Sequence, residues 1–249
     1  MNKYRYYGQI NPRDIIKFDN FVYTSDLKGI DSHHSGNLKI KIDNNTVEAI
    51  IETESNFDED LETLKNTLEY LVGGIINTAN YFYGYAVDVV LESGGNISKE
   101  IYTFPPRIRF LKESDRSLPI LDLLSFVMKT PALHRAINDL KSAIKNPMDV
   151  GFYCFRAIEA IRQNFLEDNE EDTDKAKKKS WEQMNEKLKI NKTYYSKIND
   201  NANITRHGKV TSVAGSDMEE ILIKAWTVVD RFIMYLNKGK LDEKLTVLE

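Results

Sequence analysis

One short polar segment near the C-terminal end carries the residue types that could do chemistry. Its polar side chains include Asn203, Arg206, His207 and Lys209. Together they would bind an anion, and His207 could exchange a proton near neutral pH. Gly208 is suited to closing a helix at this point, so the basic side chains could instead serve only the negative end of that helix. The sequence leaves both interpretations open.

A second group lies on a helix predicted over 148–166. Its narrow apolar stripe includes Cys154, which we expect in the core. The other side carries the residues Phe152, Phe155, Arg156, Glu159 and Arg162. Glu159 lies three positions from each arginine, so pairing within the helix would explain the charges. The alternatives are packing against another helix or the N-terminal domain, a dimer interface, or a polar cleft built on Arg156, Glu159 and Arg162.

Other chemistries find little support. A single cysteine excludes an internal disulfide and a cysteine-based metal cluster. His33 and His34 lie in a Ser/Gly loop without a third ligand nearby, so we expect plain surface there. Neither a glycine-rich phosphate loop nor a Gly-x-Ser-x-Gly elbow is present. We therefore expect no metal and no cofactor.

The composition is that of a folded protein. The 249 residues are 41% hydrophobic and 29% charged, enough for one large domain or two small ones. No stretch has the length and apolarity of a membrane helix, and no apolar run follows Met1 as in a secretory signal. We expect a cytoplasmic protein. Residues 1–111 carry 11 basic and 16 acidic side chains, and residues 112–249 carry 23 and 22, so an anionic partner is expected on the second half.

The first half is predicted to be mainly strands. Leu38, Ile40 and Ile42 alternate with polar residues, and residues 47–53 return as a second strand. An apolar stripe predicts a helix over 58–82, in which two successive glycines are a weak point. A further hairpin is expected to turn at Gly94-Gly95-Asn96. Residues 1–111 are thus predicted to form an α+β domain, an antiparallel sheet with one long helix.

The second half is predicted to be all helical. Pro105-Pro106 ends the first domain, because tandem prolines favour extended backbone. The predicted helices are 118–129, 132–145, 148–166, 174–189, 193–206 and 216–237. Ser216 and Glu219 have the spacing of a capping box at the start of the last helix. We expect a helical domain over 117–238 and a C-terminal tail over 239–249.

The order of motifs in this half resembles the HEPN superfamily, and most of all the ApeA-type HEPN domains of bacteria and phage-defence proteins. The matching features are the helix Phe155-Arg156-Ala157-Ile158-Glu159-Ala160-Ile161, a middle helix with Trp181 and Leu188, Asn203-x-x-x-His207-Gly208 closing a helix, and a capped apolar last helix. The resemblance implies an up-and-down helical bundle, frequent homodimerisation and, in many members, metal-independent RNA cleavage. Those nucleases carry an arginine four to six residues before the histidine.

The arginine of that motif is missing here. Ala202 stands five positions before His207, and Arg206 is its immediate neighbour, which on a helix points about 100° away. We therefore expect a non-catalytic, dimeric module that binds RNA or a partner protein, in a bacterial stress or phage-defence system. RNA would be bound by the residues Lys209, Arg156, Arg162 and Glu159. The alternative is a metal-independent endoribonuclease in which His207 is the general acid/base, Arg206 stabilises the phosphorane and Asn203 orients groups nearby.

Overall fold

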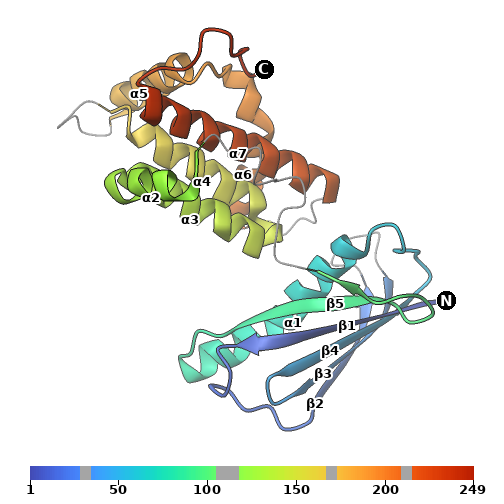
Figure 1. Ribbon diagram of the computed structural model, residues 1–249. Coiled ribbons are helices and arrows are strands. Elements are labelled where there is room, and N and C mark those ends of the chain that lie inside the picture. Colours follow the sequence, from blue (N-terminus) through green and yellow to red (C-terminus); the bar gives the residue numbers. More distant parts are fainter. Residues whose placement is uncertain (29–34, 105–117, 167–172, 209–214) are drawn as a thin grey trace. The chain divides into compact units, whose positions relative to one another are not determined.

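The computed structural model describes residues 1–28, 35–104, 118–166, 173–208 and 215–249 (Figure 1). The chain divides into two compact units, Met1–Pro106 and Arg107–Glu249. The predictions for His33, His34 and Lys209 lie outside the described residues. Each unit is considered by itself.

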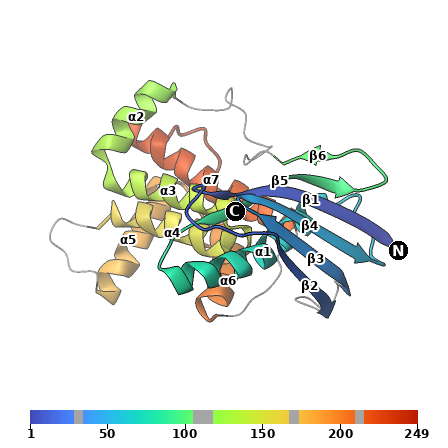
Figure 2. The same ribbon diagram turned by 90° about the horizontal axis from the view of Figure 1, so that it is seen from below.

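The first unit is built on an antiparallel sheet. Its described strands are β1 (Asn2–Asn11), β2 (Phe21–Lys28), β3 (Ser35–Asp43), β4 (Thr46–Thr53), β5 (Asp88–Asn96) and β6 (Tyr102–Thr103). They lie in the order β2-β3-β4-β1-β5-β6, which can be followed in Figure 2. Because the long β1 pairs with β4 and β5, residues far apart in sequence meet at the centre of the sheet.

One long helix covers one face of this sheet. Asp60 caps the N-terminus of helix α1 (Leu61–Tyr83), where its carboxylate accepts a hydrogen bond from the Thr63 amide. The buried face of the helix consists of Leu64, Leu68, Val72 and Ile76. The alternating inward side chains of the strands, among them Tyr4 and Tyr6, complete the core. The predicted antiparallel sheet with one long helix is confirmed.

The predicted hairpin is confirmed, because β5 and β6 pair antiparallel, but its predicted turn at Gly94-Gly95-Asn96 is wrong. These residues end β5 and pair with β1, with Gly94 opposite Tyr6. A Cβ atom on Gly94 would lie 2.3 Å from Cδ1 of the Tyr6 ring, so the glycine lets that buried ring pack onto the strand. Residues 97–101 connect β5 to β6, and the two strands pair through Ser93 with Thr103 and Gly94 with Tyr102. The Gly-Gly pair thus marks a close contact and not a reversal of the chain.

The other face of the sheet carries charged side chains, several of which pair with one another. The Lys3 ammonium lies 2.6 Å from Glu52. Glu48 pairs with two cations, Arg5 at 3.3 Å and Lys41 at 3.1 Å. Lys3 and Lys41 lie directly opposite their glutamates on the neighbouring strands, and Arg5 lies diagonally from Glu48, so each of these three cations already has a negative neighbour.

The second unit is helical. Its described helices are α2 (Ile120–Lys129), α3 (Pro131–Lys145), α4 (Val150–Gln163), α5 (Asp174–Lys187), α6 (Ser196–Arg206) and α7 (Gly215–Lys238), with 3-10 turns Pro147–Asp149 and Lys192–Tyr195 before α4 and α6. The helical part of the fold prediction is therefore confirmed. The last helix begins one residue before the predicted cap Ser216, so this residue lies inside its first turn.

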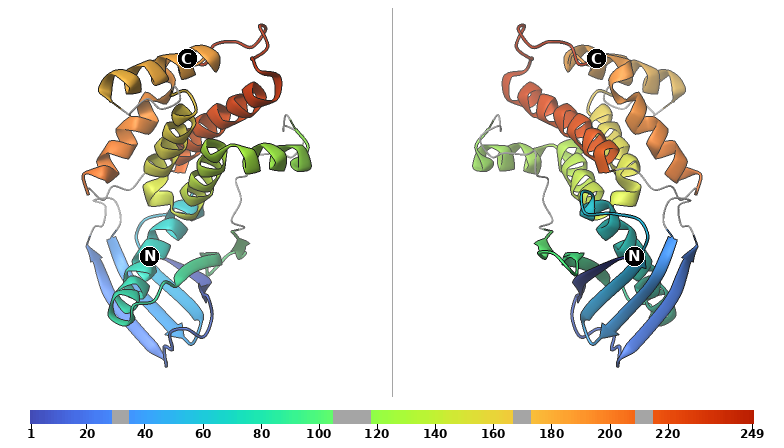
Figure 3. Two further views of the ribbon diagram at one scale, coloured as in Figure 1. Left: turned by 90° about the vertical axis from the view of Figure 1, so that its left-hand side faces the viewer. Right: turned by 90° about the vertical axis from the view of Figure 1, so that its right-hand side faces the viewer.

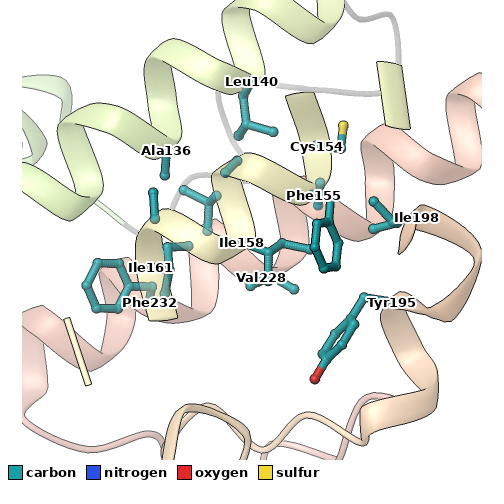
Figure 4. Close-up of a cluster of buried hydrophobic side chains, with 14 of the residues drawn as sticks. Ala136, Leu140, Cys154, Phe155, Ile158, Ile161, Tyr195, Ile198, Val228 and Phe232 are labelled. Atoms are coloured by element: carbon teal, nitrogen blue, oxygen red, sulfur yellow. The ribbon is translucent and has the colours of Figure 1, made fainter. Parts of the chain in front are cut away.

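Helix α4 lies at the centre of this unit. It packs against α3, α5, α6 and α7, and nine of its residues are buried, among them Cys154 and Phe155. Figure 4 shows Phe155 pointing from α4 toward Tyr195 and Ile198 at the start of α6. Cys154 and Phe155 belong to the same hydrophobic cluster as Leu140 of α3 and Phe232 of α7. A helix buried on several sides needs apolar residues on each of them, which explains Phe155, whereas Phe152 on the same helix is only half-buried.

Two peripheral segments differ in how they are held. Helix α2 projects from the side of the bundle (Figure 3), and its exposed apolar residues are Ile120, Leu121, Leu124 and Met128. The segment after α7 is instead fixed to the bundle. The guanidinium of Arg231 donates hydrogen bonds to the Leu188, Lys189 and Thr246 carbonyls, and Leu248 bridges to Ile190. The predicted tail 239–249 therefore packs on the helical unit.

Candidate functional site

The helical unit contains a basic groove of about 550 Å³. Helices α3, α4 and α5 form it, together with Asn164, the residue that caps the C-terminus of α4. Its described polar lining residues are Arg135, Arg156, Glu159, Arg162, Gln163, Asn164 and Lys177. Glu159 is the one carboxylate among the described lining residues, against four cationic side chains. The groove therefore concentrates positive charge in a unit whose overall charge is nearly balanced.

Arg156 is held in place from below by a buried carboxylate. Its guanidinium lies 3.1 Å from Oδ1 of Asp139 on α3, and it also lies over the rings of Phe152 and Tyr153. Asp139 is 2% exposed, and its Oδ2 has no hydrogen-bond partner in the described part of the chain. Burial raises the pKa of this carboxyl, while Arg156 and Arg135 act in the opposite direction. Asp139 thus fixes Arg156 in the groove and offsets part of its charge.

Arg162 is fixed more firmly. It is 2% exposed and donates a hydrogen bond of 2.8 Å to the hydroxyl of Ser180 on α5. Its guanidinium also lies 5.9 Å from the ring centre of Trp181. Because little of its surface reaches solvent, Arg162 is expected to act on a ligand in the groove through its charge and not through direct contact.

Arg206 approaches the groove from α6. Its Nη2 atom lies 3.0 Å from Oε2 of Glu159, and its guanidinium lies 5.0 Å from the ring centre of Phe155. Phe155 in turn stacks on Trp181, with the ring centres 6.0 Å apart. The two arginines Arg206 and Arg162 therefore lie at either end of a stacked aromatic pair, which joins α6, α4 and α5.

Close packing of α4 on α6 makes the pair of Arg206 with Glu159 possible. A Cβ atom on Gly151 would lie 2.3 Å from Oδ1 of Asn201, so the glycine allows the two helices to approach closely. The first turn of α6 contacts α7, because the Lys197 ammonium lies 2.6 Å from the carboxylates of both Asp217 and Glu220. Contacts with α4 and with α7 therefore fix the position of α6 and of Arg206 at its C-terminal end.

His207 closes α6. Its backbone amide donates to the Asn203 carbonyl at 3.1 Å, and the next residue, Gly208, has the left-handed φ of +69° expected of a helix end. His207 is exposed, and Asn203 is half-buried. The backbone thus links Asn203 and His207, whereas the side chain of Arg206 is directed to α4.

The structure brings together some of the residues singled out from the sequence and separates others. Arg156, Glu159 and Arg162 line one groove, as the cleft interpretation of α4 predicted, and Arg206 reaches it through Glu159. Phe155 is different: it is 7% exposed and packs within its own subunit, so its proposed place in a dimer interface is wrong. The reason is that α5 and α6 cover the side of α4 that the local pattern left open.

Sequence reasoning missed two exposed groove cations, Arg135 on α3 and Lys177 on α5. No local pattern marks them, because they come from separate helices. The sequence does contain a signal for Asp139, the buried partner of Arg156. This residue falls among Ala136, Leu140 and Ala143 on the apolar face of α3, and a carboxylate in such a position needs a partner from a neighbouring helix.

The structure gives little support to a reactive cysteine or to a metal site among the described residues. Cys154 is fully buried, as predicted, and burial raises the pKa of its thiol far above the ordinary value. Within the ranges that the structure describes, no three His, Cys, Asp or Glu side chains gather as a metal ion would require. The described helices also include none with the length and apolarity needed to cross a membrane. The arrangement is that of a helical unit with a groove suited to anions.

Comparisons with known proteins agree with a distinct helical half. Residues 121–237 match the sequence model of a family described as the C-terminal domain of DUF8168, a domain of unknown function. No curated protein matches the chain, and no solved structure does. The matched residues include α3 to α6 and nearly all of α2 and α7, and therefore the described residues that line the groove.

Proposed function

We propose that the helical unit is a non-catalytic RNA-binding module of the HEPN type, acting in a bacterial stress or phage-defence system. One observation carries the proposal: Arg135, Arg156, Arg162 and Lys177 surround a groove of about 550 Å³ with Glu159 as its one described carboxylate. Phosphate groups are the anions that arginine and lysine bind in nucleic acids. The order of helices and motifs that resembles HEPN proteins supports the choice of RNA.

Fluorescence anisotropy with a labelled single-stranded RNA tests the proposal. Phosphate contacts release counterions, so the logarithm of the association constant falls with the logarithm of the salt concentration by about 0.7 per contact on a single strand. We expect Arg135→Ala/Lys177→Ala to weaken binding and to reduce that slope by about 1.4. A wild-type protein that does not bind RNA at low salt would contradict the proposal.

A second candidate function is a metal-independent endoribonuclease, favoured by the exposed His207 beside Arg206 at a helix end. In this mechanism the RNA 2′-oxygen attacks the adjacent phosphorus, the bond to the 5′-oxygen breaks, and His207 takes up and returns the proton. Arg206 would stabilise the phosphorane and Asn203 would orient groups nearby. The pair of Arg206 with Glu159 opposes this, because that arginine already has a carboxylate at 3.0 Å.

Incubation of RNA with the protein in EDTA separates the two functions. The binding module predicts no cleavage by either the wild type or His207→Ala. The nuclease predicts products ending in a 2′,3′-cyclic phosphate, which His207→Ala abolishes while the melting temperature stays nearly unchanged. Analysis of the RNA ends by mass spectrometry measures this.

We also propose that the helical unit forms a homodimer, as the HEPN resemblance implies. Phe152 on α4 is only half-buried and stays a candidate for the interface, whereas Phe155 does not. Light scattering at micromolar concentration should give twice the chain mass of 28.8 kDa. A particle with the mass of a single chain would contradict dimerisation without affecting the proposal on RNA.

A further inference from the structure

Glu159 occupies an unfavourable position for a phosphate-binding groove. It lines the groove beside Arg156 and Arg162, where its negative charge repels the anion that the cations attract. Its side chain is 28% exposed, so water screens this repulsion only in part. The effect of Glu159 on a bound phosphate therefore depends on what neutralises it.

Arg206 neutralises Glu159 from outside the groove. Its Nη2 atom lies 3.0 Å from the carboxylate, but Arg206 is not among the described residues that line the groove. The Phe155 ring beneath the guanidinium fixes its direction, and the packing of α4 on α6 at Gly151 fixes the helix that carries it. Arg206 is thus positioned to cancel a charge in the groove without touching the ligand.

We propose that Arg206 is a positioning residue that sets the affinity of the groove for phosphate by neutralising Glu159. The ligand class is a phosphate-bearing polyanion, and its identification as RNA rests on the proposed function. Removal of Arg206 leaves Glu159 uncompensated and weakens anion binding. Removal of both residues restores binding, because the repulsion and its compensation disappear together.

A double-mutant cycle with two ligands tests this. Arg206→Gln, Glu159→Gln and the double variant are compared with the wild type by anisotropy on single-stranded RNA and by calorimetry on inorganic pyrophosphate. We expect Arg206→Gln to weaken binding about tenfold, and the double variant to bind within about twofold of Glu159→Gln. Arg206→Lys keeps the charge and should bind more tightly than Arg206→Gln. Melting curves monitor folding in each variant.

Two results would overturn the proposal. If the double variant binds as weakly as Arg206→Gln, the arginine contacts the ligand itself. If Arg206→Gln binds as well as the wild type, Glu159 needs no compensation.

The pyrophosphate measurements separate this proposal from the proposed function. The expected cycle with pyrophosphate, together with no binding of RNA, supports the role of Arg206 and contradicts the RNA module. An absence of binding to both ligands contradicts both proposals.

Discussion

The two units treat their charged side chains in opposite ways. On the open face of the sheet, Lys3, Arg5 and Lys41 each lie beside a glutamate on the neighbouring strand. Four cations line the helical groove with one described lining carboxylate, which itself pairs with Arg206, while the buried Asp139 offsets part of the charge of Arg156. A charged surface that is already paired has little to gain from an anion. The excess of positive charge, and not the number of charged residues, therefore distinguishes the candidate site.

The two units also have separate hydrophobic cores. Leu68 of α1 belongs to the core of the first unit, and Leu140 of α3 to that of the second. Both side chains are almost fully buried, so truncating either leaves a cavity. A leucine-to-alanine substitution at one of these two positions therefore lowers the stability of one unit, and the same substitution is available in the other unit.

The largest expected effect comes from Leu68→Ala and Leu140→Ala, each costing about 2 to 5 kcal/mol of unfolding free energy. Both tryptophans, Trp181 and Trp226, lie in the helical unit, so their fluorescence reports its unfolding. In urea, Leu140→Ala should shift the fluorescence transition, whereas Leu68→Ala should shift only the circular dichroism of the first unit. Equal fluorescence shifts for the two variants would show that the units unfold together.

The next effect concerns the close contact within the sheet. Gly94→Ala places a Cβ atom against the buried Tyr6 ring and should lower the unfolding free energy by about 1 to 3 kcal/mol. Thermal unfolding followed by circular dichroism measures this. An unchanged melting temperature would mean that Tyr6 moves aside without cost, and the structural reason for the glycine would then be wrong.

Two separate lysine-to-glutamate variants, one in each unit, test the comparison of the charged surfaces. Lys177→Glu reverses a charge in the groove and should weaken RNA binding about tenfold, because a phosphate contact becomes a repulsion. Lys39→Glu reverses an exposed charge on the sheet and should leave binding nearly unchanged. Anisotropy at one fixed salt concentration compares them. Equal losses would point to attraction by net charge alone.

The smallest effect is expected at Gly74, in the middle of α1. Apart from the adjoining residues and backbone of its own helix, no atom lies within 4 Å of the position that its Cβ would occupy, and α1 is continuous through this point. Gly74→Ala should therefore raise the unfolding free energy by about 0.5 to 1 kcal/mol, because alanine favours the helix more than glycine does. Urea unfolding measures the gain. A loss of stability would show that the position needs glycine, as Gly94 does.

Much of the fold could be predicted because the periodicity of apolar residues is local. The last helix was expected over 216–237 and spans Gly215–Lys238, and the helix of the first unit was expected over 58–82 and spans Leu61–Tyr83. In both, the repeat of a buried face extends over several turns, so its period is unambiguous. The turn expected at Gly94-Gly95-Asn96 failed because glycine serves both reversals and close contacts, and only the position of the Tyr6 ring distinguishes them.

The candidate site was predictable only in part. Arg156, Glu159 and Arg162 follow one another on a single helix, so the sequence placed them together. The side of α4 that carries Phe155 could not be assigned, since burial depends on which helices pack there. Arg135 and Lys177 carry no local signal, because nothing in their own segments indicates that α3 and α5 meet beside α4.

The sequence by itself determined the elements of this protein: an antiparallel α+β unit followed by helices, a buried Cys154, and a helix closed at Gly208. These follow from hydrophobic periodicity and from the backbone preferences of single residues, which act over a few positions. Only the tertiary structure decided the groove and the pair of Arg206 with Glu159, two residues separated by 47 positions. Electrostatic interactions depend on distance in space, and the packing of α4 against α6 sets that distance.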